Sequence, residues 1–440
     1  ESLCLYLACL KAGYTYHPLN PDYTENELKF FVENAKPAVI VCIEKKSNLF
    51  KKLAQINEID HVFTLEKDGS GTLIDESNHC VHEFKTIETP SNHIAALLYS
   101  SGTTGRPKGI MLSHKNLISN TKTLSEYWEF TNEDVLLHAL PIFHVHGLFV
   151  AIGCALYSGA SMCWLEKFNV EKIIANLPSC SVLMGVPTYY TRLLASSEFS
   201  EKTCANMRVF ISGSAPLLEE TFHDFKQLTG HKILERYGMT ETNMNTSNPI
   251  SGQRKPGTVG PPLPGVEVRV VDDNENDLGI NEIGNLFVRG PNVFEGYWKM
   301  PEKTEEDFTR DGYFKTGDKA KIDEDGYVSI VGRSKDMIIS GGLNVYPKEV
   351  ELILDDIDGV NESAVIGVPH QDLGEAVVAV VVKNETSAEI TTQILIEKAK
   401  KELAGYKVPK QIIFVDALPR NTMSKVQKNV LRDTHKLTFN

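Results

Sequence analysis

Cysteine is scarce and unevenly placed, because the chain of 440 residues has 8 cysteines and none lies beyond position 204. None belongs to a C-x-x-C pair or stands near histidines at metal-site spacing, which argues against a structural zinc site. Disulfide frameworks belong to oxidising compartments, so we expect reduced thiols and a cytoplasmic location. The cysteines are Cys4, Cys9, Cys42, Cys80, Cys154, Cys163, Cys180 and Cys204.

An excess of positive charge is also missing, since 45 basic residues face 58 acidic ones and the net charge is -13. This balance excludes a surface-wide basic face for nucleic acid or an anionic membrane, so an anionic ligand must be held locally. Long hydrophobic runs are rare as well. The charge-free stretch 148–165 is interrupted by Gly153, Ser158 and Gly159, which predicts a buried helix, a turn and a core strand rather than a membrane span.

What is present is an ordinary globular composition, with 42% hydrophobic and 23% charged residues. The length favours two or three domains. No obligatory protein partner is evident, and we expect small molecules as ligands. The chain begins at Glu1 inside an apolar periodic stretch that resembles neither a signal peptide nor a helix start. We therefore expect a fragment, with any targeting segment outside it.

The hydrophobic pattern changes twice along the chain. Up to about residue 265, helical stretches alternate with short apolar runs, which predicts a layered α/β domain with largely parallel sheets. From 265 to 332, strands separated by turns predict a β-rich, mostly antiparallel subdomain. The charged segment 333–336 is a predicted connector, and 337–440 a small α+β domain, so that the large domain spans 1–332. The predicted strands are 38–42, 94–99, 135–140, 181–186, 209–212, 266–271, 285–289, 327–331, 364–368, 377–382 and 412–415.

The segment 100–109, with the sequence SSGTTGRPKG, follows the predicted strand 94–99. Its glycines, hydroxyls and lysine offer backbone and side-chain donors to a polyphosphate. It is not the Walker pattern, because its lysine is flanked by proline and glycine. A flexible surface turn is the alternative, but it explains only the glycines. The predicted phosphate-binding residues are Ser100, Ser101, Gly102, Thr103, Thr104, Gly105 and Lys108.

This string is similar to the phosphate loop of the adenylate-forming enzymes, which include the acyl-CoA synthetases. Segments 237–241, 313–318, 332–336 and 419–425 resemble further motifs of that family, in the same order. The resemblance implies a large N-terminal domain of layered α/β sheets and a small mobile C-terminal domain. It also implies a reaction in which a carboxylate attacks the α-phosphorus of ATP, pyrophosphate leaves, and coenzyme A captures the acyl group and releases AMP.

The resemblance also implies roles for individual residues. Glu241 would hold Mg²⁺, Thr240 would contact phosphate, and Tyr237 would pack on adenine, whereas a helix-cap carboxylate is the alternative for Glu241. Asp318 and Arg333 would bind the ribose. Further nucleotide contacts would come from Gly213, Ser214, Gly238 and Met239.

Two half-reactions would share one site. Lys425 would reach the reacting carboxylate and the α-phosphate in the first, although Ser424 stands where the family usually has glycine. Rotation about Lys335 would then make room for coenzyme A. Gly341 and Gly342 would face its pantetheine arm.

The segment 235–249 resembles the malonyl-CoA synthetases, as does 296–304. The spectator carboxylate of malonate needs a cation or strong donors when buried. Arg236 is the candidate, because guanidinium matches carboxylate bidentately. A surface arginine paired with Glu235 is the alternative. Ser214 would add a hydroxyl to this pocket. His144 is also a predicted catalytic residue. The residues predicted to line the acyl channel are His144, Val145, His146 and Met244.

These features predict a malonyl-CoA synthetase that accepts methylmalonate secondarily. A synthetase for another short-chain, medium-chain or aryl acid is the first alternative. The alternative outside the enzymes is a catalytically impaired nucleotide-binding scaffold, for which Ser424 is a hint.

Overall fold

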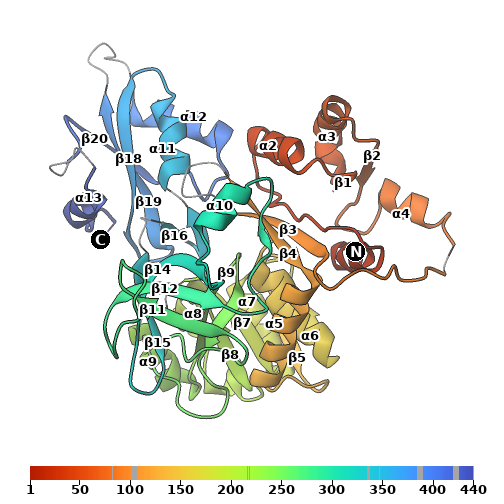
Figure 1. Cartoon of the computed structure of the whole chain (residues 1–440), viewed down its shortest axis with the longest axis horizontal. Helices are drawn as coiled ribbons and strands as arrows, with labels where there is room; N and C mark the ends of the chain where they lie inside the picture. The colour runs from red at the N-terminus through yellow and green to blue at the C-terminus, as the bar shows by residue number, and fades with distance from the viewer. Residues whose placement is uncertain are drawn as a thin grey trace.

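The structure is a computed structural model. Its described residues are 1–81, 83–100, 107–215, 217, 219–333, 337–345, 347–383, 390–419 and 426–439, with side chains described at all of these except 220, 331–333, 348 and 352. In Figure 1 the yellow to green elements of the central sheet lie below the red N-terminal helices and the blue C-terminal elements.

The central sheet of the large domain has six strands in the order β10-β9-β8-β7-β5-β6. The strands from β9 to β6 pair in parallel, and β10 pairs antiparallel to β9. Every residue of β7 and β8 is buried, as the apolar runs predicted, because helices cover both faces of a parallel sheet. The strands are β5 (Val135–His138), β6 (Ser161–Trp164), β7 (Val182–Gly185), β8 (Val209–Ser212), β9 (Leu234–Met239) and β10 (Asn243–Ser247).

The charge-free stretch 148–165 folds into the predicted buried helix, turn and strand, but the prediction of a core strand is wrong, because β6 lies at the edge of the sheet and none of its four residues is buried. A π-helical turn, η1 (His146–Ala151), continues into α6 (Ile152–Ser158), and Gly159 ends the helix at φ 69° before β6. Within the described residues, no helix combines the length and the apolar character needed to cross a membrane. The other helices of this part are α5 (His114–Tyr127), α7 (Val170–Asn176), η2 (Leu177–Ser179), α8 (Pro187–Leu194), η3 (Glu201–Cys204) and α9 (Glu219–Thr229).

The strand predicted at 94–99 forms, but the expectation of a parallel pairing is wrong for it. It becomes β3 (Ile94–Ser100) and pairs antiparallel with β4 (Lys108–Ser113), which pairs with β13 (Gly296–Tyr297). Only residues 101–107 separate β3 from β4, and a parallel crossover needs a dozen residues or more. Strands β3 and β4 are therefore antiparallel neighbours on either side of the phosphate-loop segment.

The β-rich subdomain is antiparallel, as predicted, with the strand order β11-β12-β14-β15. The turn at 323–326, between β14 and β15, is closed by the Gly326 amide, which donates to the Asp323 carbonyl at 3.0 Å. The elements are β11 (Glu267–Val271), β12 (Gly284–Arg289), α10 (Pro301–Glu306), β14 (Phe314–Ile322) and β15 (Val328–Arg333).

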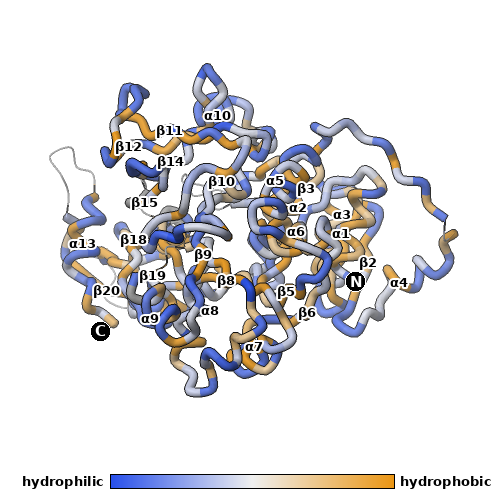
Figure 2. The backbone as a smooth tube through the Cα atoms, turned by 90° about the horizontal axis from the view of Figure 1, so that it is seen from below, coloured by the Kyte–Doolittle hydropathy of each residue, from blue (hydrophilic) through white to orange (hydrophobic). Residues whose placement is uncertain are grey.

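Most of the N-terminal elements form a small unit around the parallel strands β1 and β2, whereas the first helix packs against the main hydrophobic cluster through Tyr6. A capping box between Thr24 and Glu27 starts α2. Figure 2 shows hydrophobic segments along the central strands β5 and β8 and hydrophilic segments at outlying loops such as those near α4 and α10. The elements are α1 (Ser2–Lys11), α2 (Glu25–Ala35), β1 (Val39–Cys42), α3 (Glu44–Asn57), β2 (His61–Thr64) and α4 (Thr72–Ser77).

The C-terminal elements have their own core. Val377, Ala379 and Val381 of β19 pack in one hydrophobic cluster, whereas the alternate residues Ala376 and Val378 pack in another, so that both faces of this sheet are covered. The elements are β16 (Ile338–Ser340), β17 (Leu343–Val345), α11 (Pro347–Asp355), β18 (Val360–His370), β19 (Gly374–Lys383), α12 (Thr392–Glu402), β20 (Gln411–Val415) and α13 (Lys428–His435).

Candidate active site

The carboxyl ends of the central strands carry most of the predicted site residues. Gly213 and Ser214 follow β8, and Arg236 to Met239 end β9. Loops at this end of an open α/β sheet are where ligands bind. The fold therefore gathers side chains that are far apart in the sequence.

Arg236 is a buried cation, with 3% of its surface exposed. Its guanidinium lies against Gly213, where a Cβ atom would stand 2.3 Å from Cζ, so any side chain at position 213 would displace the guanidinium. Within the described residues, Nε and Nη2 have no hydrogen-bond partner. Burial lowers the pKa of Arg236 to about 9, while nearby Tyr190 opposes the shift. A buried cation of this kind is expected to have an anionic partner.

The neighbouring Glu235 is not that partner. Successive side chains of a strand point to opposite faces, and the Glu235 carboxyl accepts the backbone N–H groups of Leu217 and Gly257 instead. The alternative of a surface Arg236 paired with Glu235 is therefore wrong. Burial raises the pKa of Glu235 to about 8.

His146 lies near the guanidinium, and His144 lies near His146. Nδ1 of His146 is 3.2 Å from Oγ of Ser214, and Nε2 of both His144 and His146 lacks a hydrogen-bond partner among the described residues. Burial lowers the pKa of His144 to about 4, and burial with the charge of Arg236 lowers that of His146 well below its usual value. Both rings are thus neutral near pH 7, and each can donate or accept at Nε2.

Ser214 adopts a left-handed backbone conformation, with φ at 69°. Such a conformation costs a serine about 1–2 kcal/mol and persists where the surroundings impose it, often at functional sites. The predicted channel residues Val145 and Met244 are both buried in the main hydrophobic cluster. Val145 directly precedes the π-helical turn η1, a feature that often marks functional sites and that the hydrophobic pattern did not predict.

The residues predicted for adenine and ribose lie together. The Tyr237 hydroxyl donates to Oδ2 of Asp318 at 2.5 Å, and Asp318 pairs with Arg333 across β14 and β15. Gly238 lies so close to the carbonyl of Asn243 that a Cβ atom would be 1.8 Å from its oxygen. Met239, Thr240 and Glu241 follow at the end of β9 and in the tight turn to β10.

Glu241 is buried, and within the described residues no group of three His, Cys, Asp or Glu side chains can hold a metal ion by itself. A lone carboxylate fits Mg²⁺, which usually takes one or two carboxylates together with the phosphates of its substrate. The donor set thus suits a metal that binds with the nucleotide.

The phosphate-loop prediction is only partly described. Ser100 ends β3 opposite Lys108 of β4, and the Lys108 ammonium lies 3.7 Å from Asp307 and 4.0 Å above the Tyr297 ring. In this structure its charge is therefore balanced by a carboxylate, and phosphate contact stays a prediction. The predicted site residues that lie outside the described residues are Ser101, Gly102, Thr103, Thr104, Gly105, Lys335 and Lys425. The backbone of Arg333 is described, but its side chain is not.

The small domain touches the large one near this site. Gly341 and Gly342 form the turn of the β16–β17 hairpin at φ 58° and 78°, and a Cβ atom on Gly342 would stand 2.9 Å from Cγ1 of Val186. Val186 follows β7, so the hairpin lies against the carboxyl ends of the central strands. These glycines allow a close approach to Val186, and their contact with the pantetheine arm stays a prediction.

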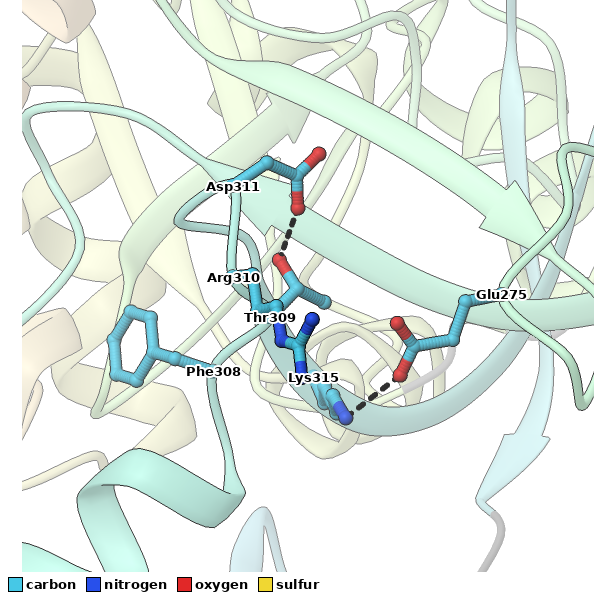
Figure 3. A pocket seen from close by; sticks show the side chains of 6 residues that line it. All are labelled: Glu275, Phe308, Thr309, Arg310, Asp311 and Lys315. Atoms are coloured by element: carbon cyan, nitrogen blue, oxygen red, sulfur yellow. Dashed lines mark hydrogen bonds and ion pairs between the residues drawn. The ribbon is translucent and has the colours of Figure 1, made fainter.

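A surface pocket of about 470 Å³ lies elsewhere and includes none of the predicted site residues. Figure 3 shows Lys315 pointing to Glu275, which it meets at 2.7 Å, while Thr309 donates to Asp311 at 2.5 Å. Because these charges are matched within the lining, the pocket offers weaker anion recognition than the Arg236 site.

Comparisons with known proteins identify the family of the chain. Residues 1–298 match the AMP-binding enzyme family, and residues 349–425 match the AMP-binding enzyme C-terminal domain. A malonate–CoA ligase of Arabidopsis thaliana is 38% identical, with 94% of this chain and 73% of that protein covered.

Two solved structures are also similar. ATP-bound MatB from Rhodopseudomonas palustris is 53% identical at a TM-score of 0.76, covering 100% of this chain and 87% of that one. A malonyl-CoA ligase in a ternary product complex with methylmalonyl-CoA and AMP is 35% identical at a TM-score of 0.84, covering 95% and 88%. The chain therefore belongs to the AMP-binding, adenylate-forming enzyme family and is an acyl-CoA ligase that uses ATP and coenzyme A.

Proposed function

We propose that this acyl-CoA ligase joins malonate, and secondarily methylmalonate, to coenzyme A through a malonyl-adenylate, releasing AMP and pyrophosphate. The observation that carries the proposal is the buried guanidinium of Arg236, whose Nε and Nη2 have no partner among the described residues. A dicarboxylate supplies the missing anion with its spectator carboxylate. The names of the similar ligases agree with this substrate.

The surroundings of Arg236 would also explain how the enzyme discriminates between dicarboxylic and monocarboxylic acids. Malonate would place two oxygens against the Arg236 fork, with Ser214 and the His146 ring beside it. A monocarboxylic acid would leave the guanidinium buried without a partner. A polar site of this kind rejects the wrong substrate by about 10⁴-fold, whereas an apolar pocket separates homologues by about 10–200-fold per methylene.

In the first half-reaction the second carboxylate of malonate would attack the α-phosphorus. Two anions have to meet in line, so positioning and charge neutralisation dominate the rate. Tyr237 and Asp318 would hold the nucleoside, and Lys425 would contact the developing charge. Mg²⁺, bound with ATP and held by Glu241, would neutralise phosphate charge.

In the second half-reaction the thiol of coenzyme A would attack the acyl-adenylate. The contact of Gly342 with Val186 supports a small-domain orientation in which the glycine hairpin lines the thiol channel. The TM-scores support the same orientation of the small domain. The score is higher with the product complex than with ATP-bound MatB, although MatB is more identical in sequence. We therefore propose 333–336 as the hinge between a large domain 1–332 and a small domain 337–440, and a cytoplasmic location in keeping with the eight free cysteines.

The test is ATP–pyrophosphate exchange with Mg-ATP and a panel of acids: malonate, methylmalonate, acetate, octanoate and benzoate. We expect malonate to be turned over fastest, followed by methylmalonate, and subsequent addition of coenzyme A to yield the thioester and AMP. Equal exchange with octanoate or benzoate would favour the synthetase for another acid. Absence of exchange with every acid would favour the nucleotide-binding scaffold.

A further inference from the structure

Strand β10 lies at an edge of the central sheet, yet all five of its residues, Asn243 to Ser247, are buried. Backbone N–H and C=O groups on a buried edge cannot be hydrated and must find partners in the protein. The backbone of residues 261–263 meets part of this need, with bonds to Asn245 and Ser247, and asparagine side chains meet a further part. They connect β10 and the turn before it to two other parts of the large domain.

The first connection comes from helix α5. Oδ1 of Asn120 accepts the Met244 amide at 3.1 Å, and Nδ2 of the same side chain donates to the Met244 carbonyl at 2.8 Å. One amide side chain thus satisfies both backbone groups of this residue. The contact fixes β10 where Met244 enters the acyl channel.

The second connection comes from the loop before β13. Nδ2 of Asn292 donates to the Thr242 carbonyl at 2.6 Å and to the Met244 carbonyl at 3.2 Å. In return, Nδ2 of Asn243 donates to the Asn292 carbonyl at 3.1 Å. The amide of Phe294, two residues further along the loop, donates to the Glu241 carbonyl at 2.8 Å.

The loop that carries these groups is itself held. Nδ2 of Asn116, at the start of α5, donates to the carbonyls of Pro291 and Val293 at 3.0 and 2.8 Å. Asn292 is 1% exposed, so water cannot replace its hydrogen bonds without a local opening. The tight turn 240–243 is therefore tied at three consecutive residues to one anchored loop.

We propose that Asn292 is a positioning residue for the ligase reaction, which holds the turn so that the Glu241 carboxylate meets Mg-ATP. The inference rests on the role of Glu241 in the proposed function. Asn292 does not touch the nucleotide in this account and acts only through the turn. Partners that orient a metal ligand typically contribute about 10–100-fold to metal affinity or activity.

Asn248 provides a matched control. It is also a buried asparagine, 1% exposed, and its Nδ2 donates to the carbonyls of Thr258 at 2.9 Å and Glu235 at 3.2 Å. Loss of its side chain removes the same kind of hydrogen bonds beyond the end of β10, away from the turn. A general loss of stability should therefore appear in Asn248→Ala and Asn292→Ala alike.

The experiment measures two quantities in Asn292→Ala, Asn248→Ala and Glu241→Gln. One is the Mg²⁺ concentration that gives half-maximal malonate-dependent pyrophosphate release. The other is amide hydrogen exchange of the segment 239–244 without ligands, which does not depend on activity. We expect Asn292→Ala to raise the Mg²⁺ requirement by about 10-fold or more and to speed exchange in this segment, while Asn248→Ala changes neither.

Equal behaviour of the two asparagine variants would overturn the inference. If Glu241→Gln also leaves the Mg²⁺ requirement unchanged, the metal role in the proposed function fails as well, so the two failures are distinguishable. Asn243→Gly is a milder variant, because glycine tolerates the φ of 49° at this position and only the return bond to the Asn292 carbonyl is lost. A Mg²⁺ requirement about threefold higher is expected for it, and no change would contradict the inference.

Discussion

Arg236 and Lys407 are both buried cations, each 3% exposed, but their surroundings are opposite. Lys407 meets Glu27 at 2.8 Å and Glu349 at 2.7 Å. Although burial works against its charge, these carboxylates raise the pKa of Lys407. For Arg236 burial lowers the pKa, and no carboxylate of the described residues offsets this effect. The missing partner, rather than burial itself, therefore marks a ligand site.

The Lys407 cluster has a different task. Glu27 belongs to α2 of the large domain, whereas Glu349 and Lys407 belong to the small domain. The Thr24 hydroxyl adds a donor to the Glu402 carbonyl at 2.9 Å across the same contact. A closed set of charges of this kind holds two parts of the protein in one orientation, and it leaves no charge for a ligand.

The largest expected effect is on catalysis and comes from Arg236→Met, which keeps an apolar side chain and removes the charge. We expect kcat/KM for malonate to fall by about 10⁴-fold, while the protein is as stable as before or more so, since a buried unpaired charge is removed. Pyrophosphate release and thermal unfolding measure the two effects. Arg254→Ala, which removes a partly buried arginine that binds the Pro249 and Ile250 carbonyls, is the control and should change stability without changing the ranking of acids.

The largest expected effect on stability comes from Lys407→Met, which leaves Glu27 and Glu349 buried without their cation. Such a break typically costs about 3–5 kcal/mol. Denaturant unfolding measures the loss, and the malonate-to-acetate preference should not change.

Removing the whole cluster sharpens this prediction. The triple variant Lys407→Met, Glu27→Gln, Glu349→Gln should recover most of the lost stability, because no unpaired charge remains. Failure of the triple variant to recover would mean that packing rather than charge explains the loss. Lys410→Met, at an exposed lysine nearby, should stay within about 0.5 kcal/mol of the parent protein.

The lowered pKa of Arg236 predicts a pH dependence of malonate binding. With a pKa of about 9, Arg236 in the empty site loses its proton as the pH rises through 9, so KM for malonate should increase above that pH by up to about tenfold per pH unit. Glu235, whose pKa is about 8, is the other titrating group near this strand. The break near pH 9 should therefore persist in Glu235→Gln, and its disappearance would assign the titration to Glu235.

The smallest effect is expected at a second contact between the domains. Arg192 binds Asp372 bidentately at 2.6 and 2.7 Å, but the side chains are 42% and 51% exposed. Exposed pairs contribute about 0–1 kcal/mol and are screened by salt. Arg192→Ala should thus lower the unfolding free energy by less than about 1 kcal/mol, and a loss as large as that of Lys407→Met would remove the contrast between buried and exposed pairs.

Much of the fold followed from local pattern. The apolar runs identified β5, β7 and β8 of the central sheet and β18, β19 and β20 of the C-terminal part, because strands buried on both faces are apolar throughout. Strands β9, β10, β16 and β17 were not predicted, since their sequences contain no continuous apolar run of this length. The antiparallel pairing of 94–100 was missed, since pairing direction depends on the connection and not on the strand itself. The π-helical turn at 146–151 also has no signal in hydrophobic periodicity.

The site was predicted less completely than the fold. Motifs identified Arg236, but only the structure places Glu235 on the other face and leaves the guanidinium without a carboxylate. The Lys407 cluster joins residues 27, 349 and 407, which no local pattern connects. Asn292 was missed for the same reason, because its partners lie about 50 positions earlier in the chain.

The central claim is that Arg236 binds the spectator carboxylate of malonate. The most direct test pairs a change in the protein with a change in the substrate: kcat/KM for malonate and for acetoacetate, which replaces that carboxylate by a neutral methyl ketone, in the parent enzyme and in Arg236→Met. The account predicts a malonate preference of about 10⁴-fold that falls to about tenfold or less in the variant. A preference that is the same in both proteins would contradict it.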